Sequence, residues 1–299
     1  MAYIIENANI LKNNKITLRS FLIDNNRITT IYNRSENYQF IKMNFEQFIM
    51  TPTFVVLHSN IPSTNTFQEL KQFMIENFLR KGSTTILTYI KVFYEDELAA
   101  KLKEFKMKLN SSPVDIMIGV RIPIRLVTPS FIRKCKKEKV PAIFVELTGQ
   151  DGLKTVPWGW IKDALFPYNC PLIPVISSFQ KKERRTVLSN WKETVIKEKI
   201  PAIYEELKEN QPLSVKVLNQ IGLYPHKGSL LNGTELSYNL YFQSREIKNV
   251  DEQTLFHYHG DRLAVTVHRG KIVRAGSKVI FMPGYGEFVE VRKPSFFSL

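Results

Sequence analysis

The sequence predicts an α/β protein in which a shortened or degenerate TIM-barrel-like βα core carries a β-sandwich module formed by the N- and C-terminal segments. Three observations lead to this prediction. Short strand-like runs fill residues 1–50, apolar strands alternate with amphipathic helices over residues 51–225, and strand-like runs return over residues 226–299. Alternating strands and helices are the pattern of parallel βαβ units, whereas strands joined by tight turns are typical of an antiparallel sheet.

The first fifty residues contain three strand-like runs separated by Asn-rich turns. The runs are YIIENANIL, KITLRSFLID and RITTIYN, and the turns are NNK and NNR. Asparagine tolerates the left-handed backbone conformation that tight turns require, so a small antiparallel sheet is expected. The runs LSYNLYF, LAVTVHRGKIV and SKVIFMPGYGEFVEV are expected to join it, because chain termini often lie close together. Residues 1–50 and 226–299 would then form one composite module.

The middle of the chain gives five strand signals instead of the eight of a complete barrel. They cover residues 54–58, 83–90, 114–122, 141–148 and 171–178. Helices are expected at about 67–82 with Gly82 as C-cap, at 95–109, from Thr128 and Pro129 onward, at 182–198 and at 201–209. A complete barrel needs roughly 200–250 residues, so this core is expected to be open, incomplete or completed by a partner. An open edge exposes unpaired strand groups, which favours a homo-oligomer, a protein partner or cover by a helix.

The formal charge of +14 is concentrated in three clusters, KLKEFKMK (101–108), RKCKKEK (133–139) and KKERR (181–185). Such a surface attracts nucleic acid, anionic lipid or acidic small molecules. The clusters also fit the solvated outer faces of helices, because their basic residues lie beside glutamates or at helical spacing. No helix-turn-helix, zinc-finger or aromatic–basic signature is present. Nucleic acid is therefore not the expected partner, whereas an anionic ligand is.

Nothing in the sequence predicts a membrane-spanning or secreted protein. No stretch approaches the roughly 18 uninterrupted apolar residues of a membrane span. The opening MAYIIENANILKNNK lacks the basic start, apolar middle and small-residue cleavage site of a signal peptide. Cys135 and Cys170 make neither a disulfide framework nor a metal-ligand pair, and a structural role is expected for both. The expected location is the cytoplasm.

Three stretches carry a resemblance to a known family. They are ITLRSFLIDNNRITTI followed by MTPTFVVLHSN, then FLRKGSTTILTYI, and finally IGLYPHKGSLLNGTELSYNLYF with VHRGKIVRAG. This order of parts resembles the amidohydrolase superfamily, in particular its dihydroorotase, dihydropyrimidinase and N-acetylglucosamine-6-phosphate deacetylase branch. The resemblance implies a barrel with a sheet built from both termini, a divalent metal such as zinc, and hydrolysis of C–N bonds.

The departures from the family pattern concern the metal ligands. The family's first strand carries two histidines one residue apart, which point to the same side and reach one metal. Here the second position is Asn60, so that His58 stands alone, and Glu146 is a counterpart of the fourth-strand ligand. The fifth strand ends in Ser177 and Ser178 where the family has a histidine. A catalytic zinc needs roughly three protein ligands and an open position, so no metal is expected, with zinc as the alternative.

Several other residues have the chemistry of a binding site. Trp158 and Trp160 lie in an expected loop and could stack a planar ligand or cover the core. Arg121 and Arg125 flank the end of the third strand of the core and could meet an anion. His257, His259 and Asp261 could bind a metal if the histidines share a strand face, although a solvent-facing strand also explains them. MPGYGEF (282–288) is interpreted as a turn, and no nucleophile–histidine–acid set can be assembled.

The sequence therefore predicts an amidohydrolase-like protein that lacks metal-dependent hydrolase activity and acts as a binding or assembly partner. The alternative is a metal-dependent hydrolase of cyclic amide or N-acyl bonds with a divergent site built on His58 and Glu146. A weaker alternative is a basic adaptor for RNA or anionic surfaces. The candidate pocket consists of His58, Asn60, Arg121, Glu146, Trp158 and Trp160.

Overall fold

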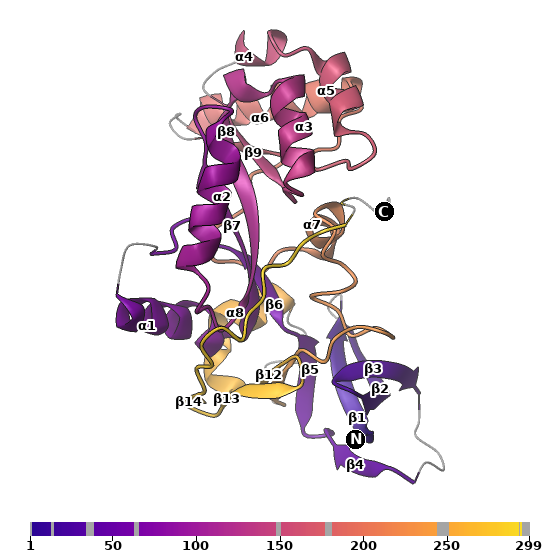
Figure 1. The fold of residues 1–299 in the computed structure, drawn as a ribbon. Helices are drawn as coiled ribbons and strands as arrows, with labels where there is room; N and C mark the ends of the chain where they lie inside the picture. The colour runs from indigo at the N-terminus through magenta and orange to yellow at the C-terminus, as the bar shows by residue number, and fades with distance from the viewer. Residues whose placement is uncertain are drawn as a thin grey trace.

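The computed structural model describes residues 2–12, 15–33, 39–62, 66–147, 151–176, 181–243, 251–292 and 294. Within these residues the chain forms two sheets, one built from both ends of the chain and one from its middle. Figure 1 shows the sheet of the middle segment and its helices lying above the sheet of the termini. No helix among these residues is long and apolar enough to span a membrane.

The sheet of the termini contains most of the strands that the sequence predicted at both ends, except that residues 287–289, at the end of the last predicted run, pair with the sheet of the middle segment. Its members are β1 (Tyr3–Lys12), β2 (Lys15–Asp24), β3 (Arg27–Tyr32), β4 (Ile41–Asn44), β5 (Phe48–Pro52), β11 (Tyr238–Phe242), β12 (Leu263–His268), β13 (Lys271–Ala275) and β14 (Lys278–Val279). The two ends meet where β5 pairs with β11, Phe48 lying opposite Phe242. The described strands that the sequence assigned to a sandwich thus lie in one hydrogen-bonded sheet, ordered β14-β13-β12-β11-β5-β1-β2-β3 with β4 beside β1.

The Asn-rich turn between β2 and β3 has the predicted conformation. Asn25 and Asn26 have φ angles of 49° and 58°, in the left-handed region that asparagine tolerates. Asn13 and Asn14 of the other turn lie outside the described residues. Apolar side chains on one face, among them Ile5, Phe21 and Met50, form the core of this module.

The middle segment forms a curled, parallel half-barrel. Its strands are β6 (Phe54–Leu57), β7 (Ser83–Lys91), β8 (Asp115–Pro123), β9 (Ile143–Glu146) and β10 (Leu172–Val175), ordered β10-β9-β8-β7-β6. The five strand signals of the sequence are confirmed, and among the described residues they form an incomplete barrel. Thr148, Ser177 and Ser178, at the ends of two predicted strands, lie outside the described residues.

Helices cover the outer face of the half-barrel. They are α1 (Phe67–Asn77), α2 (Glu97–Lys108), α3 (Pro129–Lys137), α5 (Trp158–Leu165) and α6 (Lys181–Lys197), with the short turns η1 (Leu79–Lys81), η2 (Ile124–Leu126) and α4 (Asp151–Lys154). Thr128 caps α3 as predicted, because its side chain accepts a hydrogen bond from the Phe131 N–H. The helix predicted over 67–82 ends earlier, at Asn77 with Phe78 as its C-cap, and Gly82 instead ends the short turn η1 at a φ of 72°.

The helix predicted at 201–209 is wrong. These residues form no helix, and the next described helix is α7 (Val215–Gln220), which begins after Ser214. The reason lies in the hydrogen bonds of the segment. The Ile203 N–H donates to the Leu172 carbonyl of β10 instead of to a carbonyl four residues earlier in its own chain. The segment therefore pairs with the edge strand β10 instead of forming a helix.

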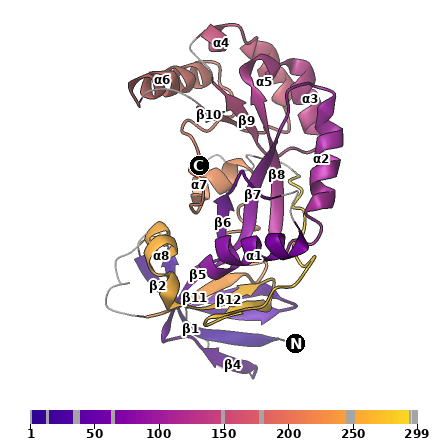
Figure 2. The same ribbon diagram turned by 90° about the vertical axis from the view of Figure 1, so that its left-hand side faces the viewer.

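The two faces of the half-barrel are covered by different parts of the chain. Phe54, Val56 and Ile86 face the outer helices, whereas Val55, Leu57 and Leu87 face inward, as the alternation along a strand requires. The inward side chains pack against apolar residues of the segment after α6, including Ile203, Leu218, Ile221 and Leu223. Figure 2 shows α2 and α3 on one side of the parallel sheet and α7 on the other.

One segment, Pro201–Leu213, spans both edges of the half-barrel, and we name it the strap. At one edge the Leu172 N–H of β10 donates to the Pro201 carbonyl at 3.0 Å. At the other edge the Asn210 and Leu213 N–H groups donate to the Leu57 and Val55 carbonyls of β6 at 2.9 and 2.8 Å. The strap thereby pairs edge groups that the sequence expected to be exposed or met by a partner.

The C-terminal segment returns to the amino end of β8. The Ile116 N–H donates to the Glu287 carbonyl, and the Val289 N–H donates to the Ile116 carbonyl, both at 2.8 Å. The turn before it contains Gly284 at a φ of 69°, as interpreted from the sequence. A Cβ on Gly286 would lie 2.0 Å from the Val114 carbonyl oxygen, so glycine is required for this close approach. The half-barrel and the terminal sheet are thus tied together at this end.

Candidate functional site

The carboxyl end of the half-barrel holds an ion pair on its inner face. Arg121, near the end of β8, donates from Nε to Glu146 Oε1 at 2.6 Å, and Glu146 is the last residue of β9. Both side chains are largely buried, with 15% and 22% of their surfaces exposed. Parallel strands bring these residues together because their carboxyl ends share one edge of the sheet. This edge is where barrel enzymes place their sites.

Tyr89 of β7 completes the arrangement around Arg121. The Arg121 Nη1 donates to the Tyr89 hydroxyl at 3.2 Å, and the guanidinium carbon lies 5.7 Å from the Tyr89 ring centroid. Burial opposes the charge on Arg121, but the contacts with Tyr89 and Glu146 outweigh it, and the pKa of the guanidinium is raised. Arg121 is therefore a fixed cation beside the carboxylate that the sequence identified as a possible metal ligand.

His58 follows β6 but lies on the opposite face. Its ring centroid is 5.2 Å from that of Phe73 and 5.4 Å from that of Phe78, both on the helix side of the sheet. Its Nδ1 lies 2.5 Å from Oδ1 of Asn210, a residue of the strap. The amide oxygen can only accept, so Nδ1 carries the proton in this pair. His58 thus links α1, β6 and the strap, and its ring does not join the pair of Arg121 and Glu146.

Asn60 lines a cavity beside the ends of β6 and β7. The cavity has a volume of about 540 Å³, and its other lining residues include Tyr89, Lys91, Lys101 and Lys108. Lys101 is held by Glu97 at 2.8 Å. The lining also contains one acid, Glu104, which contacts Lys108 at 2.7 Å, so that three lysines and one carboxylate leave the cavity basic on balance. Arg125, the other arginine considered for an anion, is exposed, and its Nη2 donates to the Phe93 carbonyl at 3.4 Å.

The two tryptophans of the candidate pocket lie in a helix, not in the loop that the sequence predicted. Both belong to α5, whose apolar face packs against the core. Trp158 is buried, and its indole N–H donates to the Leu153 carbonyl at 2.9 Å. Trp160 points away from the core and exposes 67% of its surface. A single ligand therefore cannot lie between the two rings at their positions on this helix.

His257 and His259 of the C-terminal segment do not share a strand, contrary to the arrangement that the sequence suggested for a metal site. His257 lies in α8 (Glu252–Tyr258), and His259 follows as its C-cap before η4 (Gly260–Arg262). Asp251 begins this helix, because its side chain accepts a hydrogen bond from the Thr254 N–H. Two residues apart on a helix, side chains point in different directions, so the strand-like spacing for a shared metal is absent.

The two cysteines are buried. Burial raises the pKa of both the Cys135 and the Cys170 thiols, so that neither forms a thiolate easily near neutral pH. Both belong to the core beneath the outer helices. This environment agrees with the structural role expected from the sequence.

A second charged cluster lies at the opposite, amino end of β8. Asp115, the first residue of β8, is fully buried, and its Oδ2 lies 2.5 Å from Nζ of Lys227. The same ammonium contacts Glu235 Oε2 at 2.7 Å and Glu287 Oε1 at 3.2 Å. Three carboxylates from separate segments therefore surround one lysine. In barrel enzymes the active site lies at the other end, and residues at the amino end of the strands contribute to stability.

His268, Arg269 and Tyr285 complete this cluster. His268 is fully buried with Nε2 3.4 Å from Asp115 Oδ1, and neither ring nitrogen has a hydrogen-bond partner among the described residues. Arg269 donates to Glu287 at 2.9 Å and lies 4.5 Å from the centre of the Tyr285 ring. Burial alone would raise the pKa of Asp115, but His268 and Lys227 lower it to about 2. Asp115 is therefore ionised across the neutral range.

We tested both ends of the half-barrel for their fit to a divalent metal. Ligand atoms of Asp115, Glu235 and His268 all lie within 4.8 Å of one another. However, the Lys227 ammonium already contacts two of these carboxylates, so a divalent ion would have to displace it. At the carboxyl end, Glu146 is bonded to Arg121 and His58 lies across the sheet. Neither arrangement fits a divalent cation without rearrangement.

Comparisons with known proteins relate this fold to solved enzymes. No family model and no curated protein matches the chain. The dihydropyrimidinase of Brevibacillus agri NCHU1002 is 12% identical, with a TM-score of 0.63 and 100% of both chains covered. A D-hydantoinase is 12% identical, with a TM-score of 0.67 and coverage of 98% of this chain and 99% of its own.

The L-hydantoinase (dihydropyrimidinase) of Arthrobacter aurescens is 11% identical, with a TM-score of 0.56 over 96% of this chain and 99% of its own. The chain has the fold of the amidohydrolases. The resemblance inferred from its sequence motifs is confirmed at this level. Identities this low support the fold and nothing about activity.

Sequence reasoning missed the cluster around Lys227. One signal was available, because Asp115 opens the apolar run DIMIGV and a lone acid in such a run requires a buried partner. Lys227 lies in IGLYPHKGSLLNGTELSYNLYF, one of the stretches that carry the family resemblance. Their partners Glu235, His268 and Glu287 could not be assigned, because sequence order does not reveal which distant segments meet at the start of β8.

Proposed function

We propose that this chain is an amidohydrolase-like protein without metal-dependent hydrolase activity, and that it acts as a binding or assembly partner. The observation that supports this proposal is the 2.6 Å pair of Arg121 and Glu146 on the inner face of the half-barrel. A guanidinium fixed beside a would-be ligand repels a divalent cation and occupies the carboxylate lone pairs that would bind it. A catalytic zinc also needs about three ligands, and His58 lies on the other face.

The alternative function is metal-dependent hydrolysis of cyclic amide or N-acyl bonds. Its support is the group of Asp115, Glu235 and His268, whose ligand atoms are close enough for one ion. It requires that the Lys227 ammonium move away from Asp115 and Glu235, so that a divalent cation can bind these carboxylates in its place. The names of the solved relatives, dihydropyrimidinase and hydantoinase, identify dihydrouracil and hydantoin as the substrates with which to test it.

Metal analysis of the purified protein separates the two functions. We expect less than about 0.1 zinc per chain by plasma mass spectrometry after dialysis against micromolar zinc, and no hydrolysis of dihydrouracil or hydantoin, because each end of the half-barrel already holds its own cation. Stoichiometric zinc and turnover, both lost in His58→Ala or in Asp115→Asn, would instead establish the hydrolase. Lys208→Ala, at an exposed position, is the matched control.

The proposal places the protein in the cytoplasm with a protein partner, such as a second copy or an active relative of the same fold. The strap weakens one argument for this partner, since it pairs the edges of the half-barrel within the chain. An anionic ligand is proposed for the cavity near Asn60, because Lys91, Lys101 and Lys108 line it against a single acid, Glu104. Size-exclusion chromatography with light scattering tests the assembly, and a monomer at all concentrations would reject self-association.

A further inference from the structure

A cavity of about 660 Å³ lies between the terminal sheet and the segment that follows α7. One wall comes from β1, β2 and β3, and the facing wall from the start of α7 and residues 224–231. Seven of its fourteen lining residues are aliphatic, among them Ile10, Ile31, Leu230 and Leu231. A volume of roughly 300–1,000 Å³, mainly apolar walls and a few polar groups are typical of a small-molecule site.

Backbone hydrogen bonds fix the two walls to each other. The Ile28 N–H of β3 donates to the Thr234 carbonyl at 3.0 Å, and the Leu236 N–H donates to the Asn26 carbonyl at 2.9 Å. The segment after α7 is thereby held against the hairpin of β2 and β3. A ligand does not have to order these walls when it binds, which lowers the cost of binding.

The polar groups of the cavity come mainly from one face of β2. Lys15, Thr17 and Arg19 alternate along the strand, so their side chains point to the same side. Thr17 lies opposite Ile10 of β1, which puts an aliphatic side chain directly beside them. Lys15 is exposed, whereas Leu230 on the facing wall exposes only 8% of its surface. The cavity is therefore charged at its mouth and apolar in its depth.

The charge of the lining is positive on balance. Its one acid is Glu252 of α8, against the two cations Lys15 and Arg19. No carboxylate of the described residues lies within 4.0 Å of the nitrogens of either cation. Nη1 of Arg19 donates to Oδ1 of Asn33, a neutral amide that orients the guanidinium without neutralising it. Both cations are therefore available to an anionic group.

We propose that this cavity binds a free aliphatic carboxylate, with its carboxylate over Thr17 and its chain along the apolar walls. The side chains of Lys15 and Arg19 begin about 7 Å to either side of Thr17 along the strand, and both are long enough to turn toward it. Charge-assisted hydrogen bonds from an ammonium and a guanidinium to a carboxylate are among the strongest in proteins.

An aliphatic carboxylate fits this cavity better than a simple anion or a neutral hydrocarbon. Inorganic phosphate would satisfy the cations but leave the apolar walls in contact with water. A hydrocarbon would cover the walls and leave Lys15 and Arg19 unused. This role goes beyond the proposed function, since it needs neither a metal nor a second amidohydrolase. The cavity also shares no lining residue with the one near Asn60.

Chain length tests the apolar part of the proposal. Octanoate, decanoate and dodecanoate are titrated into the full-length protein by calorimetry at 100 mM KCl. Binding is expected to strengthen about fourfold for each added methylene that the walls bury. The heat-capacity change of binding is expected to be negative, as burial of apolar surface requires. Decanol is expected to bind at least tenfold more weakly than decanoate, because it lacks the charge.

Two neighbouring residues of β2 locate the site. Thr17→Trp fills the cavity from an exposed position, and tryptophan is well tolerated in strands, so we expect folded protein with at least tenfold weaker decanoate binding. Leu18→Trp is the matched control. Leu18 exposes 49% of its surface and points to the opposite side of the strand, and this variant is expected to change binding less than twofold. Circular dichroism confirms that both variants are folded.

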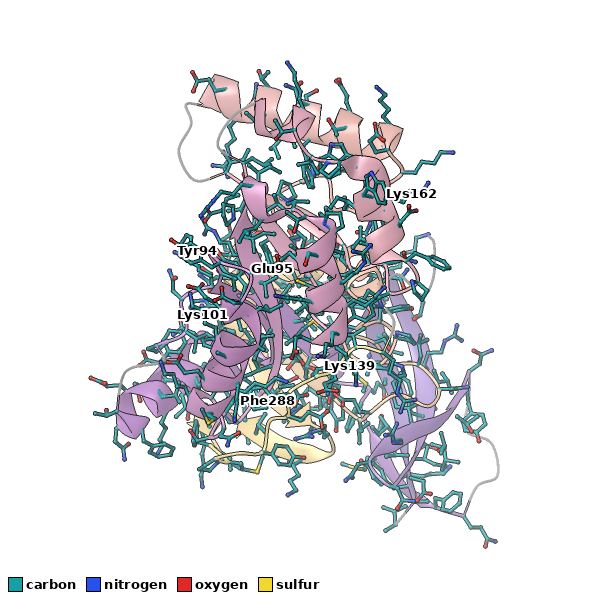
Figure 3. The ribbon with its side chains drawn as sticks, turned by 45° about the horizontal axis from the view of Figure 1, so that its top comes forward. Tyr94, Glu95, Lys101, Lys139, Lys162 and Phe288 are labelled. Carbon is teal, nitrogen blue, oxygen red and sulfur yellow. The ribbon has the colours of Figure 1, made fainter. Side chains whose placement is uncertain are left out.

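Removal of charge tests the polar part. Lys15→Met combined with Arg19→Met is expected to weaken decanoate binding at least tenfold and to leave decanol binding unchanged. The matched control is Lys162→Met combined with Lys278→Met, which removes the same charge at two exposed positions outside the cavity and is expected to change decanoate binding less than twofold. Figure 3 labels Lys162 on α5, in the helix layer of the half-barrel.

Three outcomes would overturn the proposal. Equal effects of Thr17→Trp and Leu18→Trp on decanoate binding would place the ligand elsewhere. Equal affinities for octanoate and dodecanoate would mean that only the anion is recognised. Sedimentation with phosphatidylglycerol vesicles that depends on Lys15 and Arg19 but not on Thr17→Trp, without binding of free decanoate, would mean contact with a lipid surface. The zinc experiment of the proposed function has no bearing on any of these outcomes.

Discussion

The Nζ atom of Lys227 lies 2.5 Å from Oδ2 of Asp115, and this contact joins the amino end of β8 to the segment that leads into the terminal sheet. Lys227 precedes β11 of the terminal sheet, whereas Asp115 opens β8 of the half-barrel. Burial opposes the charge on Lys227, but Asp115 and Glu235 outweigh it and raise the lysine pKa. The Lys227 ammonium is thus a cation of the protein itself, held among the carboxylates of Asp115, Glu235 and Glu287.

The first prediction concerns removal of this cation. Lys227→Met keeps most of the volume of the side chain but leaves Asp115 and Glu235 buried without a counter-charge. We expect a loss of about 3–5 kcal/mol in the free energy of unfolding, the usual cost of breaking a buried ion pair from one side. Urea unfolding followed by circular dichroism measures it. Lys208→Met, at an exposed position, should change stability by less than about 0.5 kcal/mol. A loss below about 1 kcal/mol in Lys227→Met would contradict the assignment.

The second prediction concerns acid. The pKa of Asp115 is lowered from 3.8 to about 2 in the folded protein. Its ionised form therefore stabilises the fold above about pH 4, and this contribution is lost as the pH falls toward 2. The difference in pKa corresponds to about 2 kcal/mol. Urea unfolding at intervals between pH 6 and pH 2.5 should show a weaker acid dependence in Asp115→Asn. Parallel curves for the two proteins would show that other carboxylates dominate.

Strand and helix periodicity predicted most of the fold. The five strands of the half-barrel and the three of the N-terminal segment are confirmed because each is a short apolar run bounded by turn residues. The errors lie where hydrogen bonding depends on distant residues. The strap contains residues that suit a helix, yet its N–H groups pair with β6 and β10. His257 and His259 had strand-like spacing, but the Asp251 cap starts a helix there.

The candidate site was predictable in part. Arg121 and Glu146 were both identified, since they end neighbouring parallel strands, and they form an ion pair. The sequence did not show which side of the sheet His58 faces. Side chains alternate between the two faces of a strand, so a shift of one residue along the strand moves a side chain to the opposite face. The amino-end cluster depends on five separate segments. Local patterns contain no information about which of them meet.

The third prediction concerns the pair of Arg121 and Glu146. Arg121→Met leaves a largely buried carboxylate without its partner, and we expect a loss of about 2–3 kcal/mol in stability. Glu146→Gln keeps a hydrogen-bond acceptor and should cost about 1–2 kcal/mol. The loss of stability in the double variant should be smaller than the sum of the losses in the two single variants. The difference, which is the coupling energy, should exceed about 1 kcal/mol. Strictly additive losses in urea unfolding would mean that the 2.6 Å contact contributes little.

The last prediction concerns the strap. Ile203 is buried against the inner face of the half-barrel, and its backbone pairs with Leu172 of β10. Ile203→Asp places an unpaired charge in that apolar contact, which costs several kcal/mol and favours detachment of the strap. Detachment would expose the edges of β6 and β10, whose free N–H and carbonyl groups pair readily with another chain.

We therefore expect Ile203→Asp to form larger species than the wild type at the same concentration, by light scattering after size-exclusion chromatography. Ile203→Val keeps the contact apolar and is the matched control, with a loss of about 0.5–1.5 kcal/mol and no change in size. An unchanged size for Ile203→Asp, together with a native circular dichroism spectrum, would mean that the edges stay paired without the side chain. In that case the backbone hydrogen bonds at Leu172, Leu57 and Val55 suffice to hold the strap.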